Sequence, residues 1–350
     1  MPDDPGCANS RAYQSVWRRR KGFLVLLLGV MIGLLCIDVL VGPAGLSADV
    51  LGRVLLNPRG ADPTMAIIVW QIRLPQALMA IVIGAALGLA GAEMQTVLNN
   101  PLASPFTLGI SSAAALGASL ALVFDFNLPF VPNQYVLAAN AFVFALFCAY
   151  LLDLVARKAR IGTAGIVLFG IALVFTFNAL LSLVQFTASA AALQDLIFWM
   201  MGSLARTDWP RLGAMSLVLA IVFLYSLRQS WQLTALRFGD ERATSFGVDT
   251  QKVRRAALIR ISILAALAVA LVGVIGFIGL IAPHIARRFW GEDHRWYLPA
   301  SALTGSVILI AASIASKLLA TDAVLPVGIV TTLVGIPFFL IAVLRRKVLQ

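Results

Sequence analysis

Charged residues are scarce in this 350-residue chain: Asp, Glu, Lys and Arg make up 12% of it, while hydrophobic residues make up 60%. A soluble domain carries about 25% charged residues. So little charge excludes a soluble domain of ordinary size, because the chain could not cover its apolar surface with polar groups. A membrane helix takes about 20 residues. The length and composition therefore predict an all-α polytopic membrane protein with about ten transmembrane helices, for which the lipid bilayer is the solvent.

Cysteine and histidine are also rare. Cys7, Cys36 and Cys148 lack the spacing of a metal site, and the last two lie inside apolar runs, where disulfides are not expected. His284 and His294 are interpreted as loop or packing residues. No Gly-rich stretch ends in Gly-Lys-Ser or Gly-Lys-Thr, which excludes a phosphate-binding loop of that type. We expect no catalytic residue, no metal site and no cofactor bound by this chain.

Acidic residues are few inside the apolar runs. Asp38, Glu93 and Asp153 lie nearer the ends of these runs than their centres. A proton relay requires ionisable groups within the membrane. The pattern supports such a relay only weakly, so a proton-coupled secondary transporter is kept as an alternative of another class, and an intramembrane enzyme as a third.

Ten apolar runs are long enough to be read as spans, one of them short. Their expected limits are residues 23–41, 66–98, 108–124, 136–155, 163–186, 212–227, 256–274, 280–289, 298–319 and 327–344. An additional helix over residues 190–201, in the outer loop 189–202, is too short and too polar to span, and we expect it to lie at the membrane surface. The first run is longer than a signal-peptide core, so an uncleaved span is expected there.

Basic residues set the orientation. With the N-terminus in the cytoplasm and ten alternating spans, the inner segments hold 21 of the 27 Lys and Arg residues. This asymmetry agrees with the positive-inside rule. It indicates that the net charge of +11 serves contact with an anionic inner leaflet and not binding of nucleic acid. We therefore expect a cytoplasmic segment 1–22, one transmembrane domain 23–346 and a cytoplasmic tail 347–350. The six basic residues left outside are Arg53, Arg59, Arg73, Arg206, Arg211 and Lys317.

Two groups of glycines indicate close packing of helices. Gly84, Gly88 and Gly91 form one group, and Gly273, Gly276 and Gly279 form the other. Both are expected to place glycine on neighbouring helical turns, which lets helix backbones approach closely in a membrane.

The longest inner connection, "LTALRFGDERATSFGVDTQKVRR" at 233–255, has the features of a docking segment. Gly239, Asp240 and Glu241 are expected to open a short helix, within 238–249, with acids at its positive N-terminal end. Phe246 and Gly247 are expected to close it. A short helix is marginal when it stands alone, so we expect this one to dock on a partner.

An uncharged bend interrupts the apolar sequence at "GAEMQTVLNNPLASPFTLGIS", residues 91–111. Pro101 and Pro105 each remove an N–H donor and favour a turn. We expect the side chains of Asn99, Asn100 and Ser104 to bond the freed carbonyls without adding a charge.

Four segments together resemble one family, the permease subunits of bacterial ABC importers for iron siderophores, haem and cobalamin (FecCD-like, with the type II importer fold). They are "RLPQALMAIVIGAALGLAGAEMQTVLNNPLASPFTLGIS" (73–111), "FGDERATSFGV" (238–248), "GFIGLIAPHIARRFWGEDHRWYLPASALTG" (276–305) and "LPVGIVTTLVGIPFFLIAVLRR" (325–346). Two departures stand out. Glu93 occupies a position that is usually apolar in the family, and Gln76 replaces an arginine that is common after Arg-Leu-Pro.

The resemblance implies a transport subunit rather than an enzyme, in the bacterial inner membrane. Two copies would pair around a pore, most simply as a homodimer, two ATP-binding subunits would use ATP and Mg²⁺, and a periplasmic binding protein would deliver an iron chelate. A ferric siderophore is the expected cargo, with haem or cobalamin as alternatives.

The resemblance also implies roles for individual residues. The ATPase-coupling residues would be Gly239, Asp240, Glu241, Ala243, Phe246 and Gly247. The cytoplasmic bend near the pore exit would comprise Asn99, Asn100, Pro101, Ser104 and Pro105. Arg73 and Lys317, as basic outer residues, would pair with glutamates of the binding protein.

Overall fold

The computed structural model describes residues 5–42, 45, 47–57, 62–158, 162–319 and 324–347, and these form helices with no strand. Among these residues, seven helices are long and apolar enough to cross a membrane. All ten expected spans are helical, which confirms the all-α polytopic membrane fold. Arg59, Arg160 and residues 348–350 lie outside the described part of the chain.

The helices follow one another with few long connections. Their bounds are α1 Pro5–Leu40, α2 Ala48–Leu56, α3 Pro63–Ile67, η1 Ile68–Arg73, α4 Leu74–Val97, η2 Pro105–Leu108, α5 Ile110–Phe124, α6 Asn133–Lys158, α7 Thr163–Thr187, α8 Ala190–Met200, η3 Leu204–Arg206, α9 Trp209–Arg228, α10 Ser230–Leu236, α11 Asp240–Ser245, α12 Thr250–Val272, α13 Ile278–Trp290, α14 His294–Leu318 and α15 Val327–Lys347.

Helix α4 is the centre of the bundle, and α3 and η1 lead into it as one continuous helix. Glycines bring its backbone against α13 and α14. A Cβ atom built on Gly84 would lie 2.4 Å from the carbonyl oxygen of Gly305, and one on Gly91 would lie 1.8 Å from that of Gly279. The expected close packing at Gly84, Gly88 and Gly91 is therefore confirmed, and it occurs within one subunit.

The second glycine group does not form a helical stripe, so that expectation is wrong for Gly273 and Gly276. Helix α12 ends at Val272 and α13 begins at Ile278, which places both glycines in the connection between them. Gly273 has φ of 76°, a backbone conformation that favours glycine, and a Cβ atom there would lie 2.3 Å from the carbonyl oxygen of Trp199. Only Gly279 of this group lies in a helix, where it meets Gly91.

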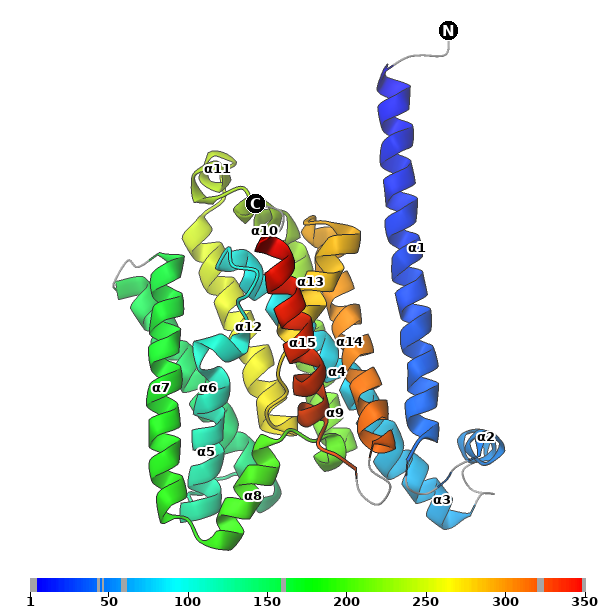
Figure 1. Ribbon diagram of the computed structural model, residues 1–350, viewed down its shortest axis with the longest axis vertical. Helices are drawn as coiled ribbons and strands as arrows, with labels where there is room; N and C mark the ends of the chain where they lie inside the picture. Colours follow the sequence, from blue (N-terminus) through cyan, green and yellow to red (C-terminus); the bar gives the residue numbers. More distant parts are fainter. Residues whose placement is uncertain are drawn as a thin grey trace.

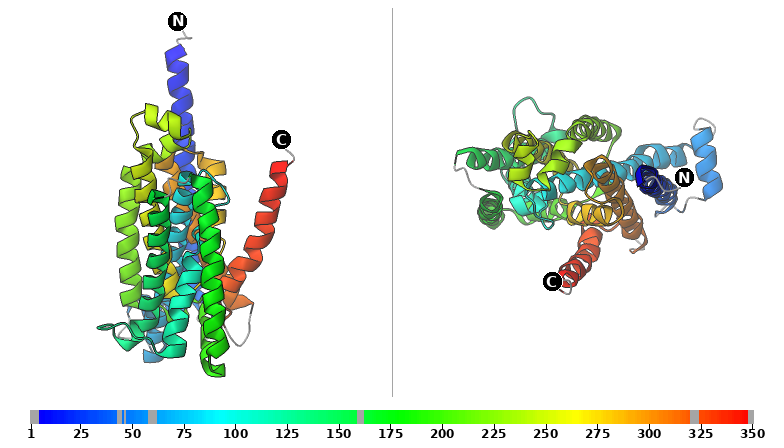
Figure 2. Two further views of the ribbon diagram at one scale, coloured as in Figure 1. Left: turned by 90° about the vertical axis from the view of Figure 1, so that its left-hand side faces the viewer. Right: turned by 90° about the horizontal axis from the view of Figure 1, so that it is seen from above.

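Two long helices stand at the edge of the bundle. Helix α1 runs along one side and projects beyond the other helices (Figure 1), and only 11% of its apolar window is buried. Helix α15 leans away from the bundle (Figure 2) and exposes Leu333, Val334 and Leu340. These faces are apolar, as expected of surfaces that meet lipid or another membrane subunit.

The short helices gather at the two ends of the bundle. The N-terminus, α10 and α11 lie at one end, whereas α2, α3 and α8 lie at the other (Figure 1). Helices α8 and α11 were expected from the sequence. Helices α2 and α10 were not, because each is only 9 or 7 residues long and lies in what the pattern indicated as a connection.

Candidate functional site

The expected coupling helix is present as α11. Gly239 precedes it with φ of 96°, a conformation that suits glycine, and Asp240 and Glu241 occupy its first turn. Ala243 is fully buried and anchors the helix, while Phe246 ends it. The flanking rings of Phe238 and Phe246 are 58% and 56% exposed. Together they give this end of the protein an aromatic surface on a projecting helix, a composition typical of interface anchors.

Asp240 is not a free acid on this surface. Its carboxylate accepts a hydrogen bond from Nη2 of Arg254 on α12 at 2.9 Å. The Nε of Arg254 donates to the carbonyl oxygen of Val97, the last residue of α4, at 2.8 Å. One arginine therefore ties α11 to α12 and to α4, and of the two expected acids Asp240 already has a partner within this chain.

Asp249 starts α12 as its N-cap. Its Oδ1 accepts the backbone N–H of Lys252 at 3.0 Å, and its Oδ2 lies 3.0 Å from Nζ of the same residue. These hydrogen bonds hold the pKa of Asp249 below its ordinary value because they favour the charged carboxylate. The cap fixes the point at which the coupling segment turns into a long helix.

The expected bend forms a compact turn between α4 and η2. Asn99 has φ of 45°, and its Oδ1 accepts a hydrogen bond from Nη1 of Arg237 at 3.2 Å. The Oδ1 of Asn100 accepts the backbone N–H of Leu102 at 3.0 Å. Both amides therefore accept N–H donors, opposite to the expected bonding of freed carbonyls. The bend itself carries no charge, but Asn99 brings it into contact with the cationic side chain of Arg237.

Prolines and a threonine complete the bend. Pro105 opens η2 and is buried, and Pro101 lies in the turn before it. Ser104 is 6% exposed, and its backbone is bonded twice by Thr107. The Thr107 hydroxyl donates to the Ser104 carbonyl at 2.7 Å and accepts its N–H at 3.3 Å. Ser104 and Thr107 thus form a capping box at the start of η2, and the Thr107 hydroxyl bonds the Ser104 carbonyl.

A polar network lies beneath the bend and the coupling segment. Arg237 pairs with Glu292, which also lies 3.5 Å from Nε of Arg287. Nη2 of Arg287 donates to Gln95 at 3.2 Å and to the hydroxyl of Tyr297 at 3.1 Å. The network joins α4, the α10–α11 connection, α13 and α14 at one end of the bundle.

His294 is a packing residue, as expected. Its two ring nitrogens lie 2.8 Å from Oγ1 of Thr96 and 3.1 Å from Oγ1 of Thr234, and the residue is fully buried. The ring of His284 packs edge-on against Phe338 of α15. Both histidines therefore connect helices.

A buried ion pair connects α4 to α12. Nε of Arg260 lies 3.1 Å from both carboxylate oxygens of Glu93, and Nη1 donates to Oε1 of Gln229 at 2.7 Å. The Arg260 and Glu93 side chains are 7% and 1% exposed. Sequence position alone placed Glu93 near a helix end and did not reveal this partner, which is 167 residues away.

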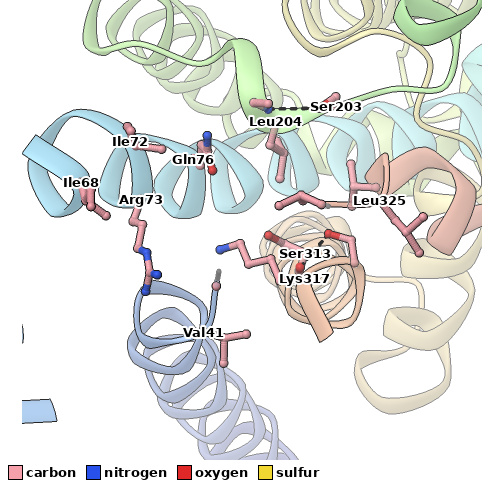
Figure 3. Close-up of a pocket in the computed structure, with 15 residues that line it drawn as sticks. Val41, Ile68, Ile72, Arg73, Gln76, Ser203, Leu204, Ser313, Lys317 and Leu325 are labelled. Carbon is pink, nitrogen blue, oxygen red and sulfur yellow. Dashed lines mark hydrogen bonds between the residues drawn. The ribbon is translucent and has the colours of Figure 1, made fainter. Parts of the chain in front are cut away.

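The two expected docking residues meet at the opposite end of the bundle, beside a cavity of about 280 Å³ (Figure 3). Arg73 is 5% exposed, and the Lys317 side chain is 6% exposed. Lys317 pairs with Asp38 at 2.8 Å. The expectation of exposed rim charges is therefore wrong, since both cations are drawn inward by α1.

A second hollow, of about 450 Å³, opens between α15 and the start of α13. Phe277 lies on its wall with φ of 67°, a strained backbone conformation for a bulky residue. Its ring packs onto Gly335, where an added Cβ atom would lie 2.3 Å from the ring. Of the ten lining residues, Thr332 carries the one polar side chain. Neither this hollow nor the role of Phe277 was expected from the sequence.

Known proteins resemble the chain over nearly its whole length. It is 36% identical to the hemin transport system permease protein of Yersinia pestis, covering 92% of this chain and 96% of the relative. It is 34% identical to the vitamin B12 import system permease protein of Vibrio cholerae, covering 95% and 96%. A solved structure, named as an inward-facing metal-chelate type ABC transporter, superposes with a TM-score of 0.82 at 29% identity, covering 93% of this chain and 99% of that one.

The model of the FecCD transport family matches residues 26–345, which include the bend, the coupling helix and both cavities. The match and the fold agree with the resemblance that the sequence motifs carry. The chain belongs to the FecCD transport family, as a permease of an ABC importer.

Proposed function

We propose that this chain forms the membrane path for an iron chelate, with a ferric siderophore as its cargo. The observation that carries the proposal is the apolar lining of the hollow beside Phe277. Water would be a far better solvent than this wall for a bare ferric ion. A chelate encloses its metal in organic groups, which suit a mainly apolar site with few polar contacts. Haem and cobalamin share that property and are the alternative cargoes.

The proposed assembly contains a second copy of this chain, two ATP-binding subunits and a periplasmic binding protein. Two helices support pairing of two copies, because they expose large apolar side chains. Phe175 and Phe186 of α7 are 71% and 89% exposed, and Leu333 and Val334 of α15 are 65% and 62% exposed. ATP and Mg²⁺ would be used by the partner ATPases, and this chain would carry neither catalytic residues nor a cofactor.

Helix α11 would transmit movement of the ATPases. Its exposed rings at Phe238 and Phe246 supply apolar anchors, and Arg254 links it to the end of α4. The bend at 99–105 lies against the same region through Arg237 and Asn99. A push on α11 would therefore reach α4 and the bend near the proposed pore exit directly.

The outer cavity would receive the binding protein. Arg73, Gln76 and Lys317 line it (Figure 3), and two of the three are cationic. Acidic side chains of a partner would be attracted to such a site. The proposed location is a bacterial inner membrane, as in the family, and the charge asymmetry of the sequence supports placing both termini in the cytoplasm.

Transport by reconstituted components tests the proposal. The permease would be placed in proteoliposomes with its cognate ATPase and binding protein, and uptake of a radioiron-labelled ferric hydroxamate would be measured. We expect uptake to require ATP and to persist when an uncoupler collapses the proton gradient. If haem or cyanocobalamin competes with this uptake and other ferric siderophores do not, the cargo would be haem or cobalamin and not a ferric siderophore. Loss of uptake with the uncoupler alone would favour a secondary transporter.

A further inference from the structure

A buried acid lies behind the wall of the outer cavity, and it holds a cation that lines the cavity. Nζ of Lys317 lies 2.8 Å from Oδ2 of Asp38 and 2.8 Å from its carbonyl oxygen. Asp38 is fully buried in the last turn of α1, whereas Lys317 comes from α14 and lines the cavity. The Asp38 carboxylate thus pairs with the Lys317 amine without itself lining the cavity.

Arg73 is bonded differently and is only partly used. Its Nη1 donates to the carbonyl oxygens of Val39 and Leu40 at 2.9 and 2.8 Å. These are terminal carbonyls of α1, which need donors from outside the helix. The Nη2 group is buried and has no hydrogen-bond partner among the described residues, and the whole residue is only 5% exposed. A buried guanidinium N–H without an acceptor is costly.

Among the described residues around the cavity, the charges do not balance. Arg73 and Lys317 bring two positive charges, and Asp38 brings one negative charge. The remaining lining includes Gln76, Ser313 and Ser316, which can donate hydrogen bonds but carry no charge. A second carboxylate would supply both the missing charge and the acceptor for Nη2 of Arg73.

We infer that Asp38 is a resident carboxylate that holds Lys317 until a carboxylate side chain of the binding protein enters the cavity. The incoming group first takes the free N–H of Arg73 and then shares or captures the Lys317 amine. Asp38 thereby competes with the partner and weakens docking. This inference rests on the proposed docking of a binding protein at the outer cavity and adds a regulator within this chain.

A purely structural role for Asp38 makes the opposite prediction. Helix α1 buries little of its surface, so the contact between Asp38 and Lys317 could serve only to hold its outer end. Removal of the carboxylate would then loosen the cavity and weaken docking. The sign of the change in affinity separates the two roles.

The test measures binding of the cognate binding protein to the complete transporter in nanodiscs. The variant Asp38→Asn removes the charge and keeps the size, while Asp49→Asn removes an exposed acid from α2 at the same end. We expect Asp38→Asn to tighten binding by about tenfold, a typical size for coupling between sites. Asp49→Asn should change it less than about twofold, and its effect should vanish in high salt, because exposed charges are screened. The effect of Asp38→Asn should persist there.

The outcomes separate this inference from the docking proposal. If Arg73→Glu with Lys317→Glu leaves binding unchanged, the docking proposal itself fails. If that pair abolishes binding but Asp38→Asn leaves it unchanged or weaker, with thermal stability retained, Asp38 is only a structural contact and the inference is overturned. Asp38→Glu, which keeps the charge, should bind like the unmodified protein.

A measurement on the unmodified protein covers the case in which Asp38→Asn does not fold. Carbodiimide activation of acidic side chains on the binding protein should link one of them to Nζ of Lys317 as an amide, identified by peptide mass spectrometry. A bound complex in which Lys317 forms no such link would also overturn the inference.

Discussion

We expect that removing one partner of the Glu93–Arg260 ion pair strongly destabilises the protein, whereas replacing both partners with apolar residues changes the free energy of unfolding little. Both side chains are almost fully buried, and Arg260 makes three contacts of 3.1 Å to the carboxylate oxygens. Glu93→Met would leave a buried guanidinium with only Gln229 as acceptor. Arg260→Met would leave a buried carboxylate. Loss of one partner of such a pair costs about 3–5 kcal/mol.

The double variant restores an apolar contact of similar volume. Replacement of a buried ion pair by hydrophobic residues is often neutral or stabilising by about 1–4 kcal/mol. We therefore expect each single variant to lose about 3–5 kcal/mol and the double variant to recover most of that loss. Unfolding in mixed micelles with increasing dodecyl sulfate, followed by circular dichroism, gives the three free-energy differences of a double-mutant cycle.

Additive single losses would refute this reasoning. The coupling energy would then be near zero, and Glu93 and Arg260 would act independently, for example through separate hydrogen bonds to α9. A double variant as unstable as the worse single variant would still show coupling, but it would contradict the expected recovery of stability by an apolar contact. The expected result requires a coupling energy of several kcal/mol between residues on α4 and α12.

Three further outcomes test the topology, the coupling surface and the packing. Cysteine at Ser245, in a background without other cysteines, should resist an impermeant thiol reagent in intact spheroplasts, and rapid labelling would reverse the orientation. Phe246→Ala should weaken ATPase association about 30-fold, the loss of an anchor worth about 2 kcal/mol, whereas Phe130→Ala at the other end should not, as pull-down titration would show. Gly91→Ala should cost at least about 3 kcal/mol, because its Cβ atom would lie 1.8 Å from a backbone oxygen, while Gly29→Ala meets nothing within 4 Å and should be neutral in the same unfolding assay.

Local patterns predicted what is local in this protein. The apolar runs gave the long helices, because a membrane helix must be apolar along its length. Gly239 and Phe246 gave the limits of α11, since helix ends depend on the conformations of a few adjacent residues. The glycines at 84, 88 and 91 predicted the closely packed face of α4, because residues without a side chain let helix backbones approach.

Contacts between distant segments could not be predicted in this way. Arg260 and Glu93 are 167 residues apart, and Lys317 and Asp38 are 279 apart. Periodicity indicates which face of a helix is apolar but not which helix packs against it, so a charge near a helix end is read as exposed. Arg73 and Lys317 were misplaced on the surface because the carbonyls and the carboxylate that hold them belong to the last turn of α1.

Helix α4 links the two proposed partner surfaces. At one end, Arg254 donates to its last carbonyl and holds the coupling helix, and Glu93 one turn earlier holds Arg260 of α12. At the other end, Arg73 directly precedes α4 and donates hydrogen bonds to the last carbonyls of α1. Between them, the glycine contacts with α13 and α14 leave no space for α4 to slide. A helix held in this way would convey a push from α11 to the bend, as the proposed coupling requires. We therefore expect conformational change to involve helices that pack less tightly than α4, such as α15, which leans away from the bundle (Figure 2) and lies beside the strained Phe277.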